Sequence, residues 1–95
     1  MKKTKSEKFE SVWDALTDTP FEAASFRTRS ELMQKVCAII HKNKWTQVEA
    51  AMRCGVTQPR INELIRGRVS HFSLDALVNI ATALGQRVEF ELQAA

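Results

Sequence analysis

Two short helical patterns in this sequence are joined by an unusually short turn. They cover residues 47–54 and 58–66. Gly55 can adopt the left-handed backbone conformation that ends the first helix, and Thr57 is a good N-cap for the second. Pro59 is tolerated because it falls in the first turn of that second helix. This spacing is typical of a helix-turn-helix, in which two helices cross at about 90–120° after a turn of three or four residues.

The small and apolar residues of this region predict how the two helices pack. They are Ala50, Ala51, Cys54, Val56, Ile61 and Leu64. Ala51 falls where the helices cross closely, so a small side chain is needed there. Val56, Ile61 and Leu64 are expected to fill the angle between the helices. The second helix then stands away from the body of the protein.

The exposed side of the second helix carries Gln58, Arg60, Asn62 and Glu63. Such side chains read base edges in the major groove: arginine pairs with guanine O6 and N7, and glutamine or asparagine with adenine N6 and N7. The sequence therefore predicts binding to double-stranded DNA. The alternative is a plain solvated helix pair in a small bundle, because helix-turn-helix units also occur without a DNA function.

Charge and helix ends favour contacts with the DNA backbone. Residues 42–68 hold six basic and two acidic side chains, a balance of +4, while the whole chain carries +3. This asymmetry fits a polyanion partner. The capped N-terminus at Gln47, together with Lys44, suits a phosphate, since helix N-termini attract anions. Arg66 and Arg68 lie at the end of the second helix, which we call the reading helix, and are placed to contact further phosphates.

Other helices are marked by their ends. Thr19, Thr28 and Thr46 each precede a glutamate by three residues, which is the capping-box pattern, and Pro20 suits the first helical position. The three glycines fall where helices should end. Besides the helix-turn-helix, these signals and the apolar spacing predict helices over residues 6–17, over residues 29–42, and from Ser73, as N-cap, to Gly85.

The period of the pattern changes after Gly85. Residues 87–93 alternate strictly, with Val88, Phe90 and Leu92 on one face, which predicts a half-buried β-strand. The rest of the chain offers no convincing strand to pair with it. We therefore expect pairing with the same strand of a second copy across a two-fold axis, giving a homodimer. The alternative is a strand-like tail packed on the helices.

Catalytic and metal-binding patterns are absent from the sequence. His41 and His71 are isolated, and we place His71 in a loop beside Arg68. Cys37 and Cys54 occupy apolar positions and lack metal-site spacing, so we expect buried thiols. We predict no enzyme activity, no metal and no cofactor. No apolar run is long enough to cross a membrane and we recognise no signal peptide, so we expect a cytoplasmic protein without membrane contact.

A family resemblance appears in one stretch, WTQVEAAMRCGVTQPRINELIRGRVSHFSLDALVNIATALG. It resembles the Xre family of DNA-binding domains, which includes the phage repressors and Cro, and the resemblance covers about residues 29–85. The resemblance implies a lambda-repressor-like helix-turn-helix core whose second helix docks in the major groove. The matching base-reading positions are Thr57, Gln58, Arg60, Asn62 and Glu63. Gln47 matches a place that often holds a phosphate, and Pro59 replaces a position that contacts bases in some phage repressors.

The flanking segments resemble the small HigA-like antitoxins of type II toxin–antitoxin pairs. They are SVWDAL…SFRTRSELMQKVCAII before the core and QRVEFEL after it. This resemblance implies a repressor that binds a palindromic operator, controls its own operon and neutralises a small toxin protein. The alternative is a stand-alone or phage-derived Xre-type regulator without a toxin partner.

These observations predict an all-α protein of about five helices with a C-terminal strand. We divide it into an N-terminal extension at 1–27 (a disordered leader and a short helix), a helix-turn-helix domain at 28–85 and a dimerisation strand at 86–95. The extension is apolar enough to fold onto the body. It could instead contact a toxin, or reach along DNA through its basic leader.

Overall fold

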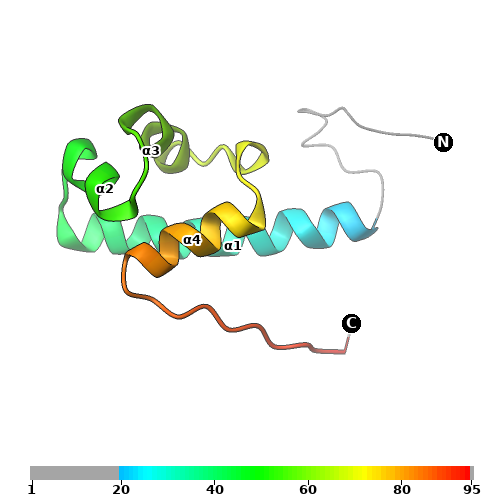
Figure 1. The fold of residues 1–95 in the computed structure, drawn as a ribbon. Helices are drawn as coiled ribbons and strands as arrows, with labels where there is room; N and C mark the ends of the chain where they lie inside the picture. The colour runs from blue at the N-terminus through cyan, green and yellow to red at the C-terminus, as the bar shows by residue number, and fades with distance from the viewer. Residues whose placement is uncertain (1–19, 95) are drawn as a thin grey trace.

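A computed structural model describes residues 20–94 of the chain. That part contains four α-helices and one 3-10 turn: α1 (Pro20–Asn43), α2 (Gln47–Cys54), α3 (Gln58–Ile65), η1 (Val69–His71) and α4 (Leu74–Ala83). The long α1 runs the length of the body, with α2 and α3 on one side and α4 packed against it (Figure 1). The described residues are therefore all-α, as predicted. The helix expected at 6–17 lies outside them.

Three helices begin at the predicted caps. The hydroxyl groups of Thr46, Thr57 and Ser73 each accept a hydrogen bond from the backbone N–H three residues later, at 3.2, 3.3 and 3.1 Å. These bonds satisfy N–H groups that have no partner inside the helix. The bounds predicted for α2 are confirmed, and those for α3 and α4 differ by only one or two residues at their ends.

The three glycines end α2, α3 and α4 as predicted. Gly55, Gly67 and Gly85 have φ angles of 72°, 75° and 79°. At Gly55 this conformation lets the N–H of Val56 reach the carbonyl of Ala51 at 3.0 Å, closing the end of α2. The chain can then enter α3 within three residues, which is what the helix-turn-helix requires.

The prediction for the first core helix was wrong at its start. We expected it to begin after Thr28, but α1 begins at Pro20 and passes through Thr28 without a break, crossing the proposed boundary between 27 and 28. Residues 20–28 contain no glycine and no internal proline. The half-buried Phe26 packs against the core, so tertiary contact extends the helix past a local start signal. α1 ends at Asn43, one residue beyond the predicted end, and is followed by Lys44, the one non-glycine residue of positive φ (57°) in the described part.

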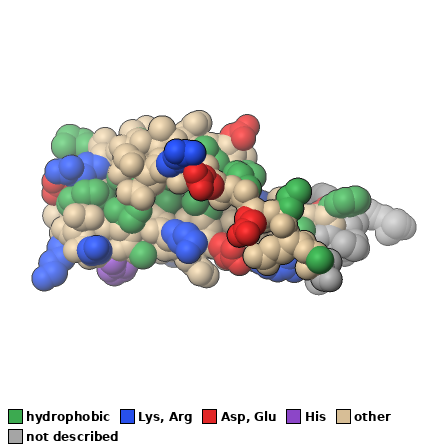
Figure 2. Space-filling model, turned by 90° about the horizontal axis from the view of Figure 1, so that it is seen from below, with side chains coloured by type: hydrophobic (Ala, Val, Ile, Leu, Met, Phe, Trp, Pro, Cys, Tyr) green, Lys and Arg blue, Asp and Glu red, His purple; other side chains and the backbone are tan. Residues whose placement is uncertain are grey.

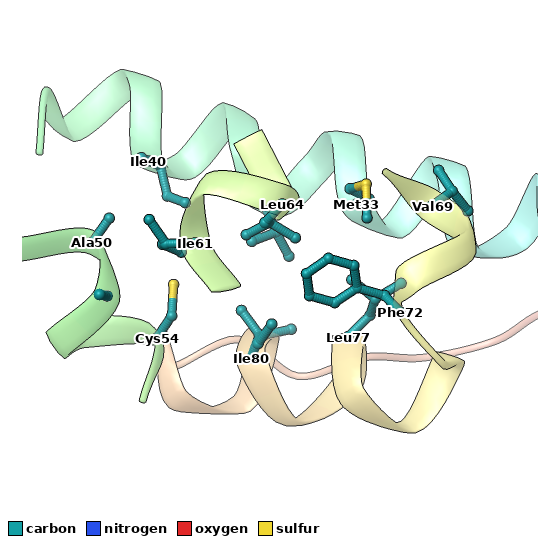
Figure 3. Packing of buried hydrophobic residues seen from close by; sticks show 13 residues of the cluster. Met33, Ile40, Ala50, Cys54, Ile61, Leu64, Val69, Phe72, Leu77 and Ile80 are labelled. Atoms are coloured by element: carbon teal, nitrogen blue, oxygen red, sulfur yellow. The ribbon is translucent and has the colours of Figure 1, made fainter. Parts of the chain in front are cut away.

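A single hydrophobic core joins all the helices (Figure 3). Its largest fully buried side chains are Phe72, Ile61, Leu64, Leu77 and Val36. Cys54 is buried, and the thiol of Cys37 donates to the carbonyl of Leu64 at 3.4 Å, linking α1 to α3. Both cysteines are free, and burial raises the pKa of each thiol. The expected buried positions of the helix-turn-helix are confirmed, except Val56, which is half-buried.

The predicted C-terminal strand is not formed among the described residues. Residues 86–94 leave α4 and run along the lower edge of the molecule, while α3 forms the upper edge (Figure 1). Val88 is half-buried and packs against the core, whereas Phe90 and Leu92 are 62% and 98% exposed. A strand is defined by its ladder of hydrogen bonds, and residues 20–94 offer this segment no neighbouring strand. The described chain thus matches the alternative of a tail packed on the helices.

This C-terminal segment borders a hollow of about 390 Å³ against α1, lined on the α1 side by Leu32, Val36 and Ile39. On the face seen from below, acidic, basic and apolar side chains are interspersed (Figure 2). None of the helices in the described part has both the length and the hydropathy needed to cross a membrane.

Candidate nucleic-acid interface

The orientation of α3 follows from its two buried residues. Ile61 and Leu64 are fully buried, and they turn one edge of α3 into the core. At about 100° per residue, the side opposite this edge carries Pro59, Asn62, Glu63 and the C-cap residue Arg66, with Gln58 and Arg60 on its flanks. The helix thus presents an almost entirely polar surface away from the body, as the sequence predicted.

Thr57, Gln58 and Asn62 occupy this surface in different ways. Thr57 and Gln58 are exposed at the start of α3, and the Thr57 hydroxyl is occupied in capping the Arg60 N–H. Asn62 is half-buried. The amide groups of Gln58 and Asn62 make no side-chain hydrogen bond to another described residue, so their donors and acceptors are available to a ligand.

Arg60 does not extend freely into solvent. Its Nη1 donates to the backbone carbonyl of His71 at 2.8 Å and to Glu63 Oε1 at 3.2 Å. The guanidinium carbon lies 3.9 Å from the centre of the Phe72 ring, a cation–π contact. The side chain still keeps 35% exposure. The segment after α3 therefore fixes the direction of this arginine.

Glu63 lies between two donors. Its Oε1 accepts from Arg60, and its Oε2 is 2.9 Å from His71 Nδ1, which acts as donor to the carboxylate. Hydrogen bonds from His71 first, and from Arg60 second, lower the pKa of Glu63 below its ordinary value. The loop histidine does lie beside Arg68, whose carbonyl accepts from the His71 N–H at 3.0 Å, and its side chain also reaches α3.

Four basic side chains near the helix-turn-helix make no ion pair with a described residue. They are Lys42, Lys44, Arg66 and Arg68, all exposed. Lys44 and Ile65 line the same hollow of about 260 Å³, so the end of α1 lies beside the end of α3. Three of the four residues predicted to meet phosphates therefore carry a charge that no described acidic group pairs with.

The fourth, Gln47, is exposed at the first position of α2. Thr46 caps the Glu49 N–H there, but the other half of the expected capping box is not formed. The Glu49 carboxylate instead accepts from Arg53 at 3.1 and 3.2 Å, and Arg53 lies 4.7 Å from the centre of the Trp45 ring. Because an (i, i+4) partner was available, the carboxylate turned along the helix and not back to its start.

Comparison with known proteins agrees with this geometry. A family model described as a helix-turn-helix domain matches residues 15–93. The chain belongs to this helix-turn-helix family. The helix-turn-helix protein is also similar to a solved structure named "Putative XRE Family Transcriptional Regulator", with a TM-score of 0.71 and 28% identity over 78% of this chain and 83% of that chain. None of the curated proteins compared with the sequence matches it.

Two residues that support the helix-turn-helix interface were missed in the sequence. Phe72 directly precedes the cap of α4 and packs with Leu77, four residues into that helix, which is the hydrophobic-staple pattern and could have been found (Figure 3). Arg29 on α1 donates from Nη1 to the carbonyls of Val69 and Phe72, both at 3.2 Å. Its partners are 40 and 43 residues away, so no local pattern could reveal them.

Proposed function

We propose that this helix-turn-helix protein is a sequence-specific DNA-binding transcriptional repressor. The observation that carries the proposal is α3, a capped helix with a buried inner edge and an outward polar side, with four exposed basic residues near the helix-turn-helix that pair with no acidic group in the described part. Helix-turn-helix regulators place such a helix in the major groove. The similar solved structure is named as a transcriptional regulator, which supports regulation as the purpose of binding.

In this proposal Thr57, Gln58, Arg60, Asn62 and Glu63 read bases. The amides of Gln58 and Asn62, which bond to no described side chain or backbone group, have the donor and acceptor pattern that pairs with adenine. Arg60 retains exposure despite its internal bonds, and Glu63 keeps acceptor capacity. Because these groups lie on one helix, they would read consecutive positions of a single half-site.

Lys44, Gln47, Arg66 and Arg68 would contact phosphates. These exposed cations, which pair with no described acidic group, supply affinity that does not depend on sequence. The backbone N–H groups of Gln47 and Val48, at the start of α2, have no partner among the described residues and are suited to donate to a phosphate oxygen. Together these contacts would fix the register of α3 on the duplex.

We further propose a homodimer that binds a roughly palindromic operator. The alternating segment 86–94 exposes Phe90 and Leu92 while Val88 faces the core, so pairing with a second copy would satisfy its backbone and cover its apolar side chains. Two α3 helices could then enter successive major grooves about 34 Å apart. Truncation after Gly85 tests the interface: sedimentation should show a monomer, and a persisting dimer would place the interface elsewhere.

The function is tested by titrating the purified protein against DNA from upstream of its own gene, with random duplex as competitor, over a series of salt concentrations. A repressor of its own operon should bind tightly and resist the competitor at each salt concentration. Complete removal by random DNA at every salt concentration would leave the helix-turn-helix shape without a reading function.

A second role, as the antitoxin that neutralises a small toxin protein, is also proposed. The resemblance of the flanking segments motivates it, and Phe21 at the start of α1 offers an 86% exposed aromatic surface for a partner. Co-expression with the product of the adjacent reading frame should give a stable complex and relieve toxicity. If no adjacent frame encodes such a protein, a stand-alone or phage-derived regulator is the better description.

A further inference from the structure

Arg60 and Glu63 on α3 are held by His71 and Phe72 in the segment after it, and we call these four residues the reading cluster. We infer that the reading cluster acts as one unit that selects a G·C base pair, and that His71 is its positioning residue. The inference rests on the proposed DNA-binding function. It adds the preferred base pair and a residue outside the helix-turn-helix that sets the preference.

The free edge of Arg60 is the first part of the argument. An arginine has five N–H donors, and the two on Nη1 are used by the His71 carbonyl and by Glu63. The donors on Nε and Nη2 engage no described residue. One Nε donor and one Nη2 donor form a parallel pair that matches guanine O6 and N7. Packing of the guanidinium face on Phe72 and the bonds at Nη1 fix the direction of this pair.

The free acceptor sites of Glu63 are the second part. A carboxylate offers about four lone-pair sites, and Arg60 and His71 occupy one on each oxygen. The remaining sites can accept from the N4 amino group of cytosine. Because Arg60 favours guanine and Glu63 favours cytosine, both halves of the cluster prefer the same kind of base pair. The two neighbouring donors also offset the repulsion between Glu63 and nearby phosphates.

His71 contributes through Glu63 and does not need to touch a base. Its Nδ1 holds Glu63 Oε2 at 2.9 Å, so the carboxylate is fixed at both ends. The bond from Arg60 goes to the backbone carbonyl of His71, which any substitution at this position retains. His71→Ala therefore removes one specific bond and leaves the stacking of Arg60 on Phe72 in place. His71 is 43% exposed, so the variant should fold.

The test starts with selection of binding sites from a random duplex library by the full-length protein. The wild-type protein should enrich a motif with two-fold symmetry. The same selection with Arg60→Ala should lose the preference at one base pair of each half-site, and that base pair should be G·C. Replacing it with A·T should weaken wild-type binding roughly 5- to 150-fold, the range expected for loss of a bidentate pair. Replacing the guanine with 7-deazaguanine, which lacks the N7 acceptor, should also weaken wild type and leave Arg60→Ala unaffected.

Three variants then isolate His71. His71→Ala should keep the rest of the motif but lose a substantial part of the discrimination at this one base pair. His71→Asn, which keeps an N–H donor near the place of Nδ1, should restore it. Ser70→Ala, a change at an exposed neighbour in the same turn, is the matched control and should behave as wild type. Thermal unfolding of each variant verifies that the fold is intact.

The outcomes separate this inference from the proposed function. If wild type enriches no motif, the proposed function itself fails. If a motif appears but Arg60→Ala relaxes an A·T pair, or none, the assignment of a G·C pair is wrong while sequence-specific binding stands. If His71→Ala leaves discrimination unchanged, or weakens all duplexes equally, His71 is not a positioning residue.

Discussion

Arg29→Met tests how α1 holds the segment that supports α3. The substitution removes the Nη1 group that donates to two part-buried carbonyls, those of Val69 and Phe72, together with exposed bonds from Nε to Ser25. The Val69 carbonyl keeps a second bond, from the Phe72 N–H at 3.0 Å. The substitution therefore leaves mainly the Phe72 carbonyl poorly satisfied. Burial lowers the pKa of Arg29, which means that desolvation of the guanidinium offsets part of the gain. Methionine keeps most of the apolar stem.

One charge-assisted hydrogen bond to a part-buried acceptor contributes about 1.5–3 kcal/mol to stability. Because desolvation of the Arg29 guanidinium cancels part of this gain, we use the lower part of the range. We expect the free energy of unfolding to fall by about 2 kcal/mol and the melting temperature by roughly 8–16 °C. Thermal and urea unfolding, followed by circular dichroism, measure both quantities. Arg27→Met is the control, because Arg27 lies on the same helix, is exposed and bonds to no described residue. If the two variants agree within about 0.5 kcal/mol, the bonds to Val69 and Phe72 do not stabilise the fold.

Four other substitutions provide three separate tests. Arg68→Ala should weaken binding to all duplexes alike and reduce by about 1 the slope of log binding constant against log salt concentration. Arg60→Ala should cost about 1–3 kcal/mol of binding free energy on the operator only. Equal losses on operator and random DNA for both variants would refute these roles. Gly55→Ala should lower the free energy of unfolding in urea by about 1 kcal/mol. The cause is backbone strain alone, because an added Cβ meets nothing within 4 Å and φ is +72°. An unchanged urea midpoint would contradict the left-handed cap. Folding lowers the pKa of Glu63, so the ionised carboxylate stabilises the fold. This stabilisation is present above the ordinary glutamate pKa of about 4.3 and is lost as the pH falls through the lower pKa of the folded state. Glu63→Gln should accordingly narrow the stability difference between pH 6 and pH 3, and an unaltered difference would argue against the bonds to His71 and Arg60.

The sequence predicted what local rules determine. Caps at Thr46 and Ser73 and the glycine at 55 act within one turn of the backbone, so the ends of α2 and α4 could be placed to within a residue or two. The apolar period placed Ile61 and Leu64 in the core for the same reason. The direction of the polar side of α3 follows from these positions.

Contacts between distant segments could not be predicted in this way. α1 continues through Thr28 because Phe26 packs on the core, although the local pattern there signals a helix start. The turn of Arg60 toward His71 depends on the path of the chain after α3, which no helix pattern specifies. The strand expected after Gly85 requires a neighbouring strand that the described part of one chain does not provide.

The most direct test of DNA reading by α3 is dimethyl sulfate protection on the selected duplex, because the reagent methylates guanine N7 in the major groove. We predict two symmetric sets of protected guanines about 34 Å apart along the duplex. In Arg60→Ala, one guanine in each set should lose its protection. Uniform reactivity of guanine N7 in a tight, specific complex would contradict major-groove reading by this helix.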